Sequence, residues 1–408
     1  MTLDPHVLGR RTLLAAAAAT PLLAGRARAQ ARPLRIGVLN DQTGPYRDIG
    51  GQLSVNAVRQ AVAESGSGLQ VEVLAADHQN KPDIGVGIAR QWYDQEDVAL
   101  IVDVPTSSVA LAVNNVAKEK NRAYINTGAA TTDLTGVQCT PCTIHWSYDT
   151  YMLARSTGGA MVAAGGDSWY FVTADYVFGQ QLQRDTTQFV TAAGGKVAGA
   201  SLYPFPGTTD FSSFLLSAQN SGAKVLGLAN AGADTVNSIK QAVEFGLTRK
   251  MKIAALLMYI NDVHGLGLEA AQGLYLTESF YWDMNDRTRA FTKRFQARMP
   301  GLVPNMTNAG AYAGTLHFLK AVQALGAGRA LDGAAVVAQM KATPTDDDAY
   351  GPGSIRADGL ALFPSYLFQV KAPGESKYAW DYFKQVVATP ADKAWKPLAD
   401  GGCPLVRT

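Results

Sequence analysis

From residue 34 onward the chain alternates between two hydrophobic patterns. Short runs rich in β-branched residues predict strands, and the longer segments between them repeat apolar residues at the helical period. Helices are predicted near residues 49–64, 82–95 and 107–120. Strands that alternate with helices of this length form a parallel sheet covered on both faces. The first four strands are predicted at residues 34–40, 69–75, 98–103 and 122–126.

A second series with the same plan follows a break in the pattern. Two long helical segments come after it, near 286–299 and 308–326, and then a pair of antiparallel edge strands at 366–371 and 378–387. A chain of this length exceeds what one hydrophobic core usually organises, so we expect two α/β lobes, each a doubly wound parallel sheet. The second series predicts strands at 168–173, 196–202, 224–230 and 252–257, and helices at 177–193, 210–221 and 233–246.

The first 29 residues have the pattern of an export signal. Arg10 and Arg11 precede an apolar run at 12–23, and Ala27-Arg28-Ala29 offers a small-x-small cleavage site. The arginine pair favours the twin-arginine route. An uncleaved anchor is disfavoured, because about twelve apolar residues are too few to span a bilayer. We therefore expect a periplasmic protein that begins near Gln30.

Removing this signal changes the charge balance. The 36 basic and 34 acidic residues become 32 and 33, because Arg10, Arg11, Arg26, Arg28 and Asp4 are lost. A nearly neutral chain without a basic stripe predicts no nucleic-acid partner. No later segment has the length and apolarity of a transmembrane helix. The sequence thus predicts an exported protein whose slightly basic composition belongs to its signal.

Three cysteines fit an oxidising compartment. Cys139 and Cys142 form a C-x-x-C, and Cys403 lies near the end of the chain. A zinc site would need further ligands nearby, and the five histidines are scattered. One disulfide with one remaining thiol is expected, and its connectivity does not follow from sequence. We favour Cys139–Cys403, which would tie down the C-terminal tail.

Motifs of common α/β enzymes are missing from the sequence. It contains no G-x-S-x-G, H-E-x-x-H or P-loop lysine. Gly85–Arg90 begins like a dinucleotide fingerprint but lies within a predicted helix, and Asp346–Asp348 lacks the spacing of a calcium loop. The sequence therefore predicts a protein without a cofactor or metal that is not an enzyme.

Five segments together resemble a known family. In order along the chain they are residues 36–45 (IGVLNDQTGP), 103–108 (DVPTSS), 127–136 (TGAATTDLTG), 174–179 (ADYVFG) and 210–213 (DFSS). They resemble the periplasmic solute-binding proteins of branched-chain amino acid type, which serve ATP-binding-cassette (ABC) importers, and the likeness spans residues 34–390. The resemblance implies the type I periplasmic binding fold, two lobes joined by three crossing segments that close on ligand by a hinge.

The hinge is expected near residues 143–149, 278–282 and 357–366. The corresponding boundaries place residues 33–145 and 280–360 in the first lobe, and residues 146–279 and 361–408 in the second. A monomer is expected, with a small-molecule ligand and an ABC permease as its partners.

Ligands of parallel sheets bind beyond the carboxyl ends of the strands, and these positions carry the candidate ligand-binding residues. By resemblance, Ser107, Ser108, Ala129 and Thr131 hold the ligand's carboxylate, although serine or threonine there also caps helices. Aromatic candidates have core or hinge packing as their alternative role. The remaining candidates are Tyr46, Ala130, Trp146, Tyr148, Tyr176, Phe178, Asn230, Ala231, Met258 and Tyr259.

One departure from the family pattern bears on the ligand. Amino-acid binders place an acidic residue after the strand predicted at 252–257, but Met258 and Tyr259 stand here, and Asp262 is interpreted as the N-cap of the next helix. An ammonium buried without a partner costs several kcal/mol. We therefore expect a carboxylate without an amine, favouring an aromatic acid. The alternatives are a branched-chain or other amino acid, a small amide, or a sensory ligand-binding module.

Overall fold

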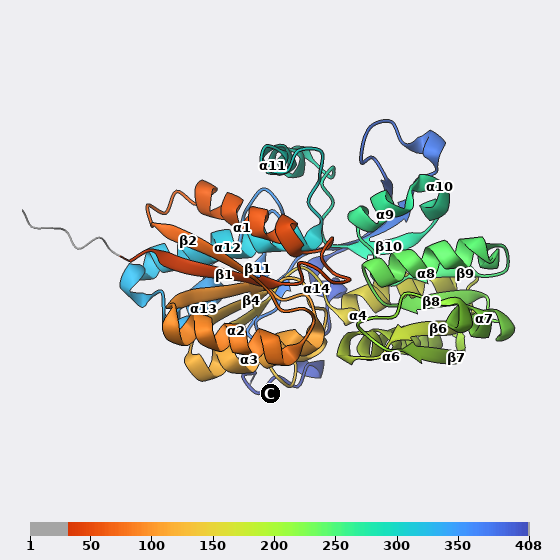
Figure 1. Cartoon of the computed structure of the whole chain (residues 1–408), viewed down its shortest axis with the longest axis horizontal. Helices are drawn as coiled ribbons and strands as arrows, with labels where there is room; N and C mark the ends of the chain where they lie inside the picture. The colour runs from red at the N-terminus through yellow and green to blue at the C-terminus, as the bar shows by residue number, and fades with distance from the viewer. Residues whose placement is uncertain (1–31, 407–408) are drawn as a thin grey trace, which may run out of the picture. The chain divides into compact units, whose positions relative to one another are not determined.

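A computed structural model describes residues 32–406, and the predicted export signal lies outside them. Within these residues no helix is both long enough and apolar enough to cross a membrane. The first lobe is built on a parallel sheet in the order β2-β1-β3-β4-β5 (Figure 1). Its strands are β1 (Leu34–Asn40), β2 (Val71–Asp77), β3 (Val98–Asp103), β4 (Ala123–Asn126) and β5 (Thr143–His145).

Helices cover both faces of the first sheet. Val38 of β1 packs into the cluster that α1 and α12 share, whereas its neighbour Leu39 packs with α2 and α3 on the opposite face. This alternation follows from the period of two along a strand. The helices of this lobe are α1 (Gly51–Glu64), α2 (Pro82–Gln95), α3 (Ser107–Lys120), α11 (Asp286–Gln296), α12 (Met306–Leu325) and α13 (Gly333–Ala342).

The second lobe is built on a sheet of seven strands in the order β14-β13-β10-β9-β8-β6-β7. Strands β6 to β10 are parallel, and the predicted antiparallel pair forms its edge. The prediction of two lobes with doubly wound parallel sheets is confirmed. The strands are β6 (Ser168–Ala174), β7 (Lys196–Tyr203), β8 (Val225–Ala229), β9 (Lys252–Ala255), β10 (Tyr275–Glu278), β13 (Ser365–Val370) and β14 (Phe383–Thr389).

Helices also flank both faces of this second sheet (Figure 1). Phe171 of β6 packs on the side of α6, and its neighbour Val172 packs on the side of α7 and α8. The elements are α4 (Thr150–Leu153), a π-helical turn (Ala154–Gly158), α5 (Gly159–Ala163), α6 (Val177–Ala192), α7 (Ser212–Asn220), α8 (Ala233–Glu244), α9 (Ile260–Leu266) and α10 (Leu268–Ala271).

The chain passes between the lobes after β5, after β10 and before β13, which is where the sequence predicted the crossing segments. Hydrogen bonds fix the first crossing segment: the Ser279 hydroxyl of the second segment donates to the Ser147 carbonyl, and the Ser147 hydroxyl donates to the carbonyl of Met306, at the start of α12, at 3.1 Å. The His145 N–H donates to the Gly359 carbonyl at 2.9 Å. A small hairpin of β11 (Ser354–Ile355) and β12 (Ala361–Leu362) precedes the last crossing.

The C-terminal tail returns to the first lobe, whereas the sequence assigned it to the second. After β14 and α14 (Ala391–Ala394), the Trp395 indole donates to the Phe363 carbonyl at 2.8 Å. A disulfide joins Cys139 to Cys403, the pairing that the sequence favoured, and Cys142 is a buried free thiol. The covalent link to residue 139 explains why the tail lies against the first lobe.

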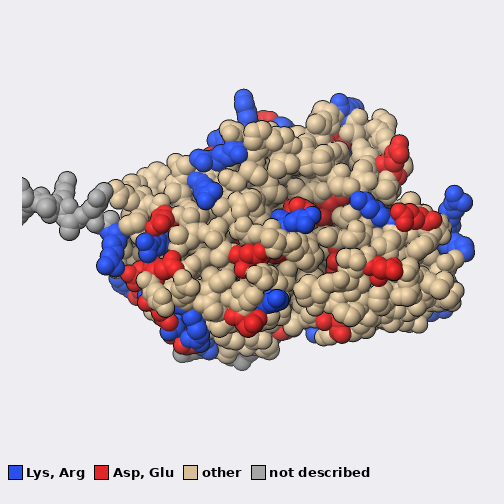
Figure 2. Space-filling view, in the orientation of Figure 1, with Lys and Arg blue, Asp and Glu red and all other residues tan. Residues whose placement is uncertain are grey.

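Basic and acidic side chains are interspersed on the face displayed in Figure 2. This mixture agrees with the nearly neutral charge of the chain after residue 29.

Candidate functional site

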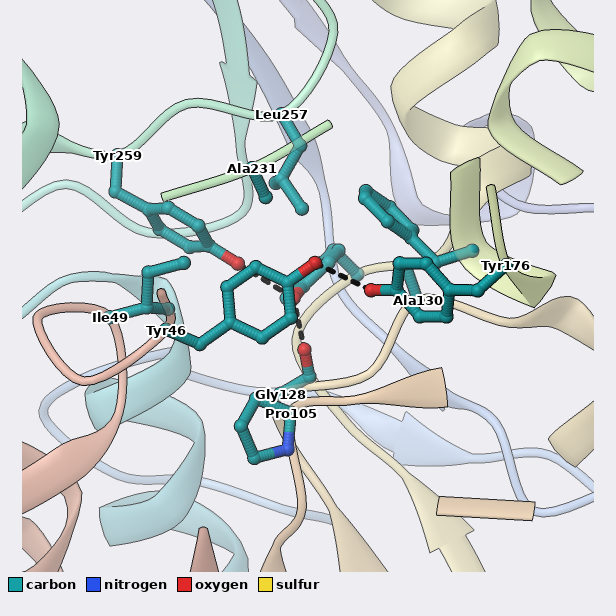
Figure 3. Close-up of a pocket in the computed structure, with 11 residues that line it drawn as sticks. Tyr46, Ile49, Pro105, Gly128, Ala130, Tyr176, Ala231, Leu257 and Tyr259 are labelled. Atoms are coloured by element: carbon teal, nitrogen blue, oxygen red, sulfur yellow. Dashed lines mark hydrogen bonds between the residues drawn. The ribbon is translucent and has the colours of Figure 1, made fainter. Parts of the chain in front are cut away.

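A pocket lies where loops of both lobes meet (Figure 3). Its lining residues follow the carboxyl ends of strands in both sheets, where ligands of parallel sheets bind. Tyr148 of the first crossing segment also lines it. The first lobe contributes Tyr46, Ile49, Pro105, Gly128 and Ala130, and the second contributes Tyr176, Phe178, Ala231, Leu257 and Tyr259.

A buried polar network shapes the first-lobe side of the pocket. The Asn126 amide donates to the carbonyls of Asp103 and Val104, both at 3.1 Å, and its oxygen accepts from the Ala129 N–H at 3.1 Å. These bonds hold Asp103 and Val104 at φ +87° and +56°, a region that residues other than glycine rarely adopt. The network therefore supports strained backbone immediately before Pro105.

Gly128 completes this wall because a side chain would not fit there. A Cβ on Gly128 would lie 2.7 Å from both the Pro105 Cα and an Asp103 carboxylate oxygen. That carboxylate accepts from the Asn40 amide at 3.0 Å and from the Thr127 hydroxyl at 3.1 Å. Burial raises the pKa of Asp103, and these hydrogen bonds partly offset the rise.

Four tyrosine hydroxyls converge in the pocket as two pairs. The hydroxyls of Tyr46 and Tyr176 share a hydrogen bond of 2.5 Å. The Tyr259 hydroxyl donates to the Tyr148 hydroxyl at 2.6 Å, and Tyr148 in turn donates to the Gly128 carbonyl. Burial raises the pKa of each of these tyrosines above its ordinary value of 10.0, so all four are neutral phenols at physiological pH.

The pocket is uncharged and nearly filled. None of its eleven lining residues carries a charged side chain. The cavity volume is about 10 Å³, room for about one water molecule. A ligand the size of an amino acid or a benzoate therefore enters only if the rings or the lobes move apart.

Seven of the predicted site residues line this pocket and seven do not. Ser107 is buried and its hydroxyl has no hydrogen-bond partner, whereas Ser108 is half-buried. The Thr131 hydroxyl accepts from the Asp133 N–H at 3.3 Å and thereby caps a short 3₁₀ helix (Thr132–Leu134). Ala129 is buried, and its N–H donates to the side-chain oxygen of Asn126 at 3.1 Å.

The other candidates away from the pocket have packing or structural contacts. Trp146 packs against His317 and Phe363 in the core near the crossing segments. Asn230 accepts from the Thr235 hydroxyl at 2.7 Å, and Met258 lies in the core of the second lobe. Core or hinge packing is the alternative role that the sequence left open for Trp146, whereas it offered no such alternative for Asn230 or Met258.

Five residues at this site were missing from the candidates predicted from the sequence. Pro105 and Gly128 lie within quoted motifs, and Leu257 ends a predicted strand, so loop position was the available signal. Phe205 follows β7, and its ring stacks on Tyr176 with centroids 4.3 Å apart and on Tyr46 at 5.3 Å. Ile49 gave no signal beyond its helical period.

Asp262 has a different role from the one predicted. Tyr259 is the N-cap of α9, and Asp262 at the third helical position accepts from the Tyr259 N–H at 2.9 Å. Asp262 is buried, and burial raises its pKa to about 7. Its carboxyl does not line the pocket.

Comparison with known proteins identifies the family. A family model described as periplasmic binding protein matches residues 33–376. The fold is similar to a solved periplasmic binding protein from Burkholderia mallei, with 47% sequence identity and a TM-score of 0.88 over 92% of this chain and 99% of that one.

Two further relatives specify the type. A branched-chain amino acid ABC transporter periplasmic ligand-binding protein from Burkholderia xenovorans LB400 is 36% identical, with a TM-score of 0.79 over 91% of this chain and 99% of that one. A Leu/Ile/Val-binding protein homolog 4 from Brucella abortus (strain 2308) is 23% identical over 87% of this chain and 88% of its own. The chain therefore belongs to the periplasmic binding proteins, in the branched-chain amino acid type whose members bind solutes for ABC transporters.

Proposed function

We propose that this protein binds a small aromatic carboxylate between its lobes and delivers it to an ABC importer. The observation that carries the proposal is the lining of the pocket, which combines aromatic and aliphatic walls with four neutral phenol hydroxyls and has no charged side chain. Aromatic rings pack favourably on such walls. Phenol hydroxyls donate to or accept from the polar substituents of a ring.

The absence of charge from the lining argues against an α-amino acid. Its ammonium would need a buried carboxylate, and an unpaired ion costs several kcal/mol to bury. The nearest candidate by sequence, Asp262, is engaged by the Tyr259 N–H. An acid without an amine avoids this penalty.

The N-terminus of α3 supplies the anchor for the carboxylate in this proposal. Pro105 lines the pocket two residues before Ser107, which begins this helix of 14 residues. Helix N-termini favour anions, and Thr106, the N-cap, makes no side-chain capping bond. The unpartnered Ser107 hydroxyl is fully buried. A carboxylate that reached it would satisfy a donor that otherwise stays unpaired.

Relatives support the choice of compounds to test. A solute-binding protein of an ABC transporter from R. palustris, solved in complex with 4-hydroxybenzoate, shares this fold at 22% identity with a TM-score of 0.78. Relatives named for branched-chain amino acids make leucine the necessary competitor.

Isothermal titration with 4-hydroxybenzoate, benzoate and leucine tests the proposal. We expect an aryl acid to bind and leucine to bind weakly or not at all. Ser107→Ala should weaken aryl acid binding ten-fold or more, because a hydrogen bond to a charged group contributes about 1.5–3 kcal/mol. Ser213→Ala, an exposed serine on α7, is the matched control and should bind like the wild type. Tight leucine binding without response to any aryl acid would refute the proposal.

Export by the twin-arginine route is a further part of this proposal. It rests on the Arg10-Arg11 pair before the apolar run. Replacing both arginines by lysine should retain the precursor in the cytoplasm, as fractionation would show. Unchanged periplasmic recovery would instead indicate general secretion.

A further inference from the structure

A first-lobe loop, residues 44–46, lies directly against the second lobe; we call it the docking loop. Its Pro45 carbonyl accepts from the Ala233 N–H, at the start of α8, with a distance of 3.1 Å. Backbone of one lobe therefore bonds to backbone of the other. Within its own lobe the loop is fixed by Asp41, whose carboxylate accepts from the N–H groups of Gly44 at 2.6 Å and Tyr46 at 2.8 Å.

Gly232 makes this close approach possible. Its φ of +59° and ψ of −134° are open to glycine and strained for other residues. A Cβ at this position would lie 2.5 Å from the Pro45 carbonyl oxygen and 3.2 Å from the Tyr46 ring. Any side chain at 232 would therefore push the docking loop away from α8.

The Tyr46 side chain extends the contact into the pocket (Figure 3). Its hydroxyl bonds to the Tyr176 hydroxyl at 2.5 Å, and its ring stacks on Phe205 at 5.3 Å. Phe205 also stacks on Tyr176 at 4.3 Å, so one second-lobe ring contacts both members of the pair. Tyr46 is only 2% exposed in this arrangement.

We propose that Tyr46 and Gly232 are positioning residues for closure of the cleft. The docking loop seats on the second lobe through protein contacts alone, and the incoming ligand separates Tyr46 from Tyr176 to gain its space. Three contacts of the docking loop cross between the lobes, and with the Tyr46–Tyr176 pair in place the cavity has room for about one water molecule. Seating of the docking loop on the second lobe is the closure step, and it does not depend on which ligand binds. Separation of Tyr46 from Tyr176 by the ligand is the displacement step, and it rests on the proposed function.

Small-angle X-ray scattering of the mature protein, from residue 30 to the C-terminus and without added ligand, tests the closure step. The wild type should give the radius of gyration calculated from the described residues. Gly232→Ala should give a larger one, because its methyl group displaces the docking loop. Gly246→Ala is the matched control, since Gly246 lies two residues after the end of α8, also has a positive φ (+67°) and has open space around its Cβ position.

A second pair of variants addresses the hydroxyl contact and guards against misfolding. Tyr46→Phe keeps the ring and removes only the bond to Tyr176, so it should shift the open population several-fold. Tyr170→Phe is its control, because the Tyr170 hydroxyl bonds to Ser201 at 2.7 Å within the second lobe. Far-ultraviolet circular dichroism identifies any expansion that comes from unfolding.

The outcomes separate the two proposals. Expansion in Gly232→Ala and Tyr46→Phe, with native dichroism and unchanged controls, supports the docking loop even if 4-hydroxybenzoate does not bind. An expanded ligand-free wild type that no variant alters would overturn it. If 4-hydroxybenzoate binds, Tyr46→Phe should accelerate its association in stopped-flow measurements, and an unchanged rate would overturn the displacement step.

Discussion

The two lobes contribute to the pocket in different ways. The first lobe offers mainly backbone and small residues, such as Pro105, Gly128 and Ala130, on loops held by the buried amide of Asn126. The second lobe offers large side chains, such as Phe178 and Tyr259, held by packing and single hydroxyl bonds. Hydrogen bonds from Asn126 thus fix much of the first-lobe wall, whereas packed rings, with Ala231 and Leu257 beside them, make up the second-lobe wall. Rigid positioning and adaptable contact are divided between the lobes.

The difference has a physical basis in the cost of unsatisfied groups. Each group bonded to Asn126 is buried, so moving the loop would leave several polar groups without partners. A ring that rotates or shifts exchanges one set of dispersion contacts for another and leaves at most one hydroxyl to be satisfied. The first-lobe wall should therefore be sensitive to deletions that the second-lobe wall tolerates.

The largest effect is expected for Asn126→Ala. The change leaves the Val104 carbonyl and the Ala129 N–H without partners, and the Asp103 carbonyl keeps only the Thr127 N–H at 3.2 Å, so the free energy of unfolding should fall by about 3 kcal/mol or more. Urea unfolding measures it, with Asn220→Ala, an exposed residue at the end of α7, as control. A loss below about 1 kcal/mol would remove the proposed difference between the lobes.

A smaller and graded effect is expected along the hydroxyl chain. Tyr148→Phe deprives the Gly128 carbonyl of its donor and Tyr259 of its acceptor, so it should cost about 1–3 kcal/mol of unfolding free energy. Tyr259→Phe leaves the bond from Tyr148 to Gly128 intact and should cost about 1 kcal/mol or less. Thermal and urea unfolding compare the two variants. The reverse order would mean that the Tyr259 hydroxyl contributes more to the free energy of unfolding than the Tyr148 hydroxyl does.

Thr131→Ala separates capping from ligand contact. The hydroxyl accepts from the Asp133 N–H and Thr131 does not line the pocket, so its removal should cost about 1 kcal/mol of unfolding free energy. Aryl acid affinity should change little in isothermal titration. A ten-fold loss of affinity with unchanged melting would instead support the carboxylate contact that the family resemblance implies.

The smallest change in the free energy of unfolding is expected for Glu278→Gln at acidic pH. This change should grow as the pH rises. Glu278 is fully buried at the end of β10, and burial raises its pKa well above the ordinary value of 4.5, with Asp262 adding to the rise. The unfolded chain loses this proton at lower pH than the folded chain, so raising the pH above about 4.5 favours unfolding. Glu278→Gln should therefore gain stability relative to the wild type between pH 5 and pH 8.

Urea unfolding at both pH values measures this difference. Glu244→Gln, an exposed residue at the end of α8, serves as control. A constant difference between Glu278→Gln and the wild type across the range would show that the side chain titrates alike in the folded and unfolded chains.

Local patterns were enough for most of the secondary structure. Strands 34–40 and 98–103 and helices 82–95 and 107–120 lie where the sequence predicted them. The helix ends follow local chemistry, with Pro82 in the first turn of α2 and Asn121 left-handed after α3. Strand β10 was not predicted, and its four residues are defined by pairing with β9 on one side and β13 on the other.

The sequence by itself determined the two α/β lobes, their order along the chain and the loops that carry the site, because hydrophobic period and turn chemistry act over neighbouring residues. The tertiary structure alone decided which loop residues enter the cleft. Thr131 and Tyr176 both follow strands, yet one caps its own 3₁₀ turn and the other bonds to Tyr46 of the opposite lobe. The direction of a loop side chain depends on partners far away in sequence, and those partners are neighbours only after both lobes have folded.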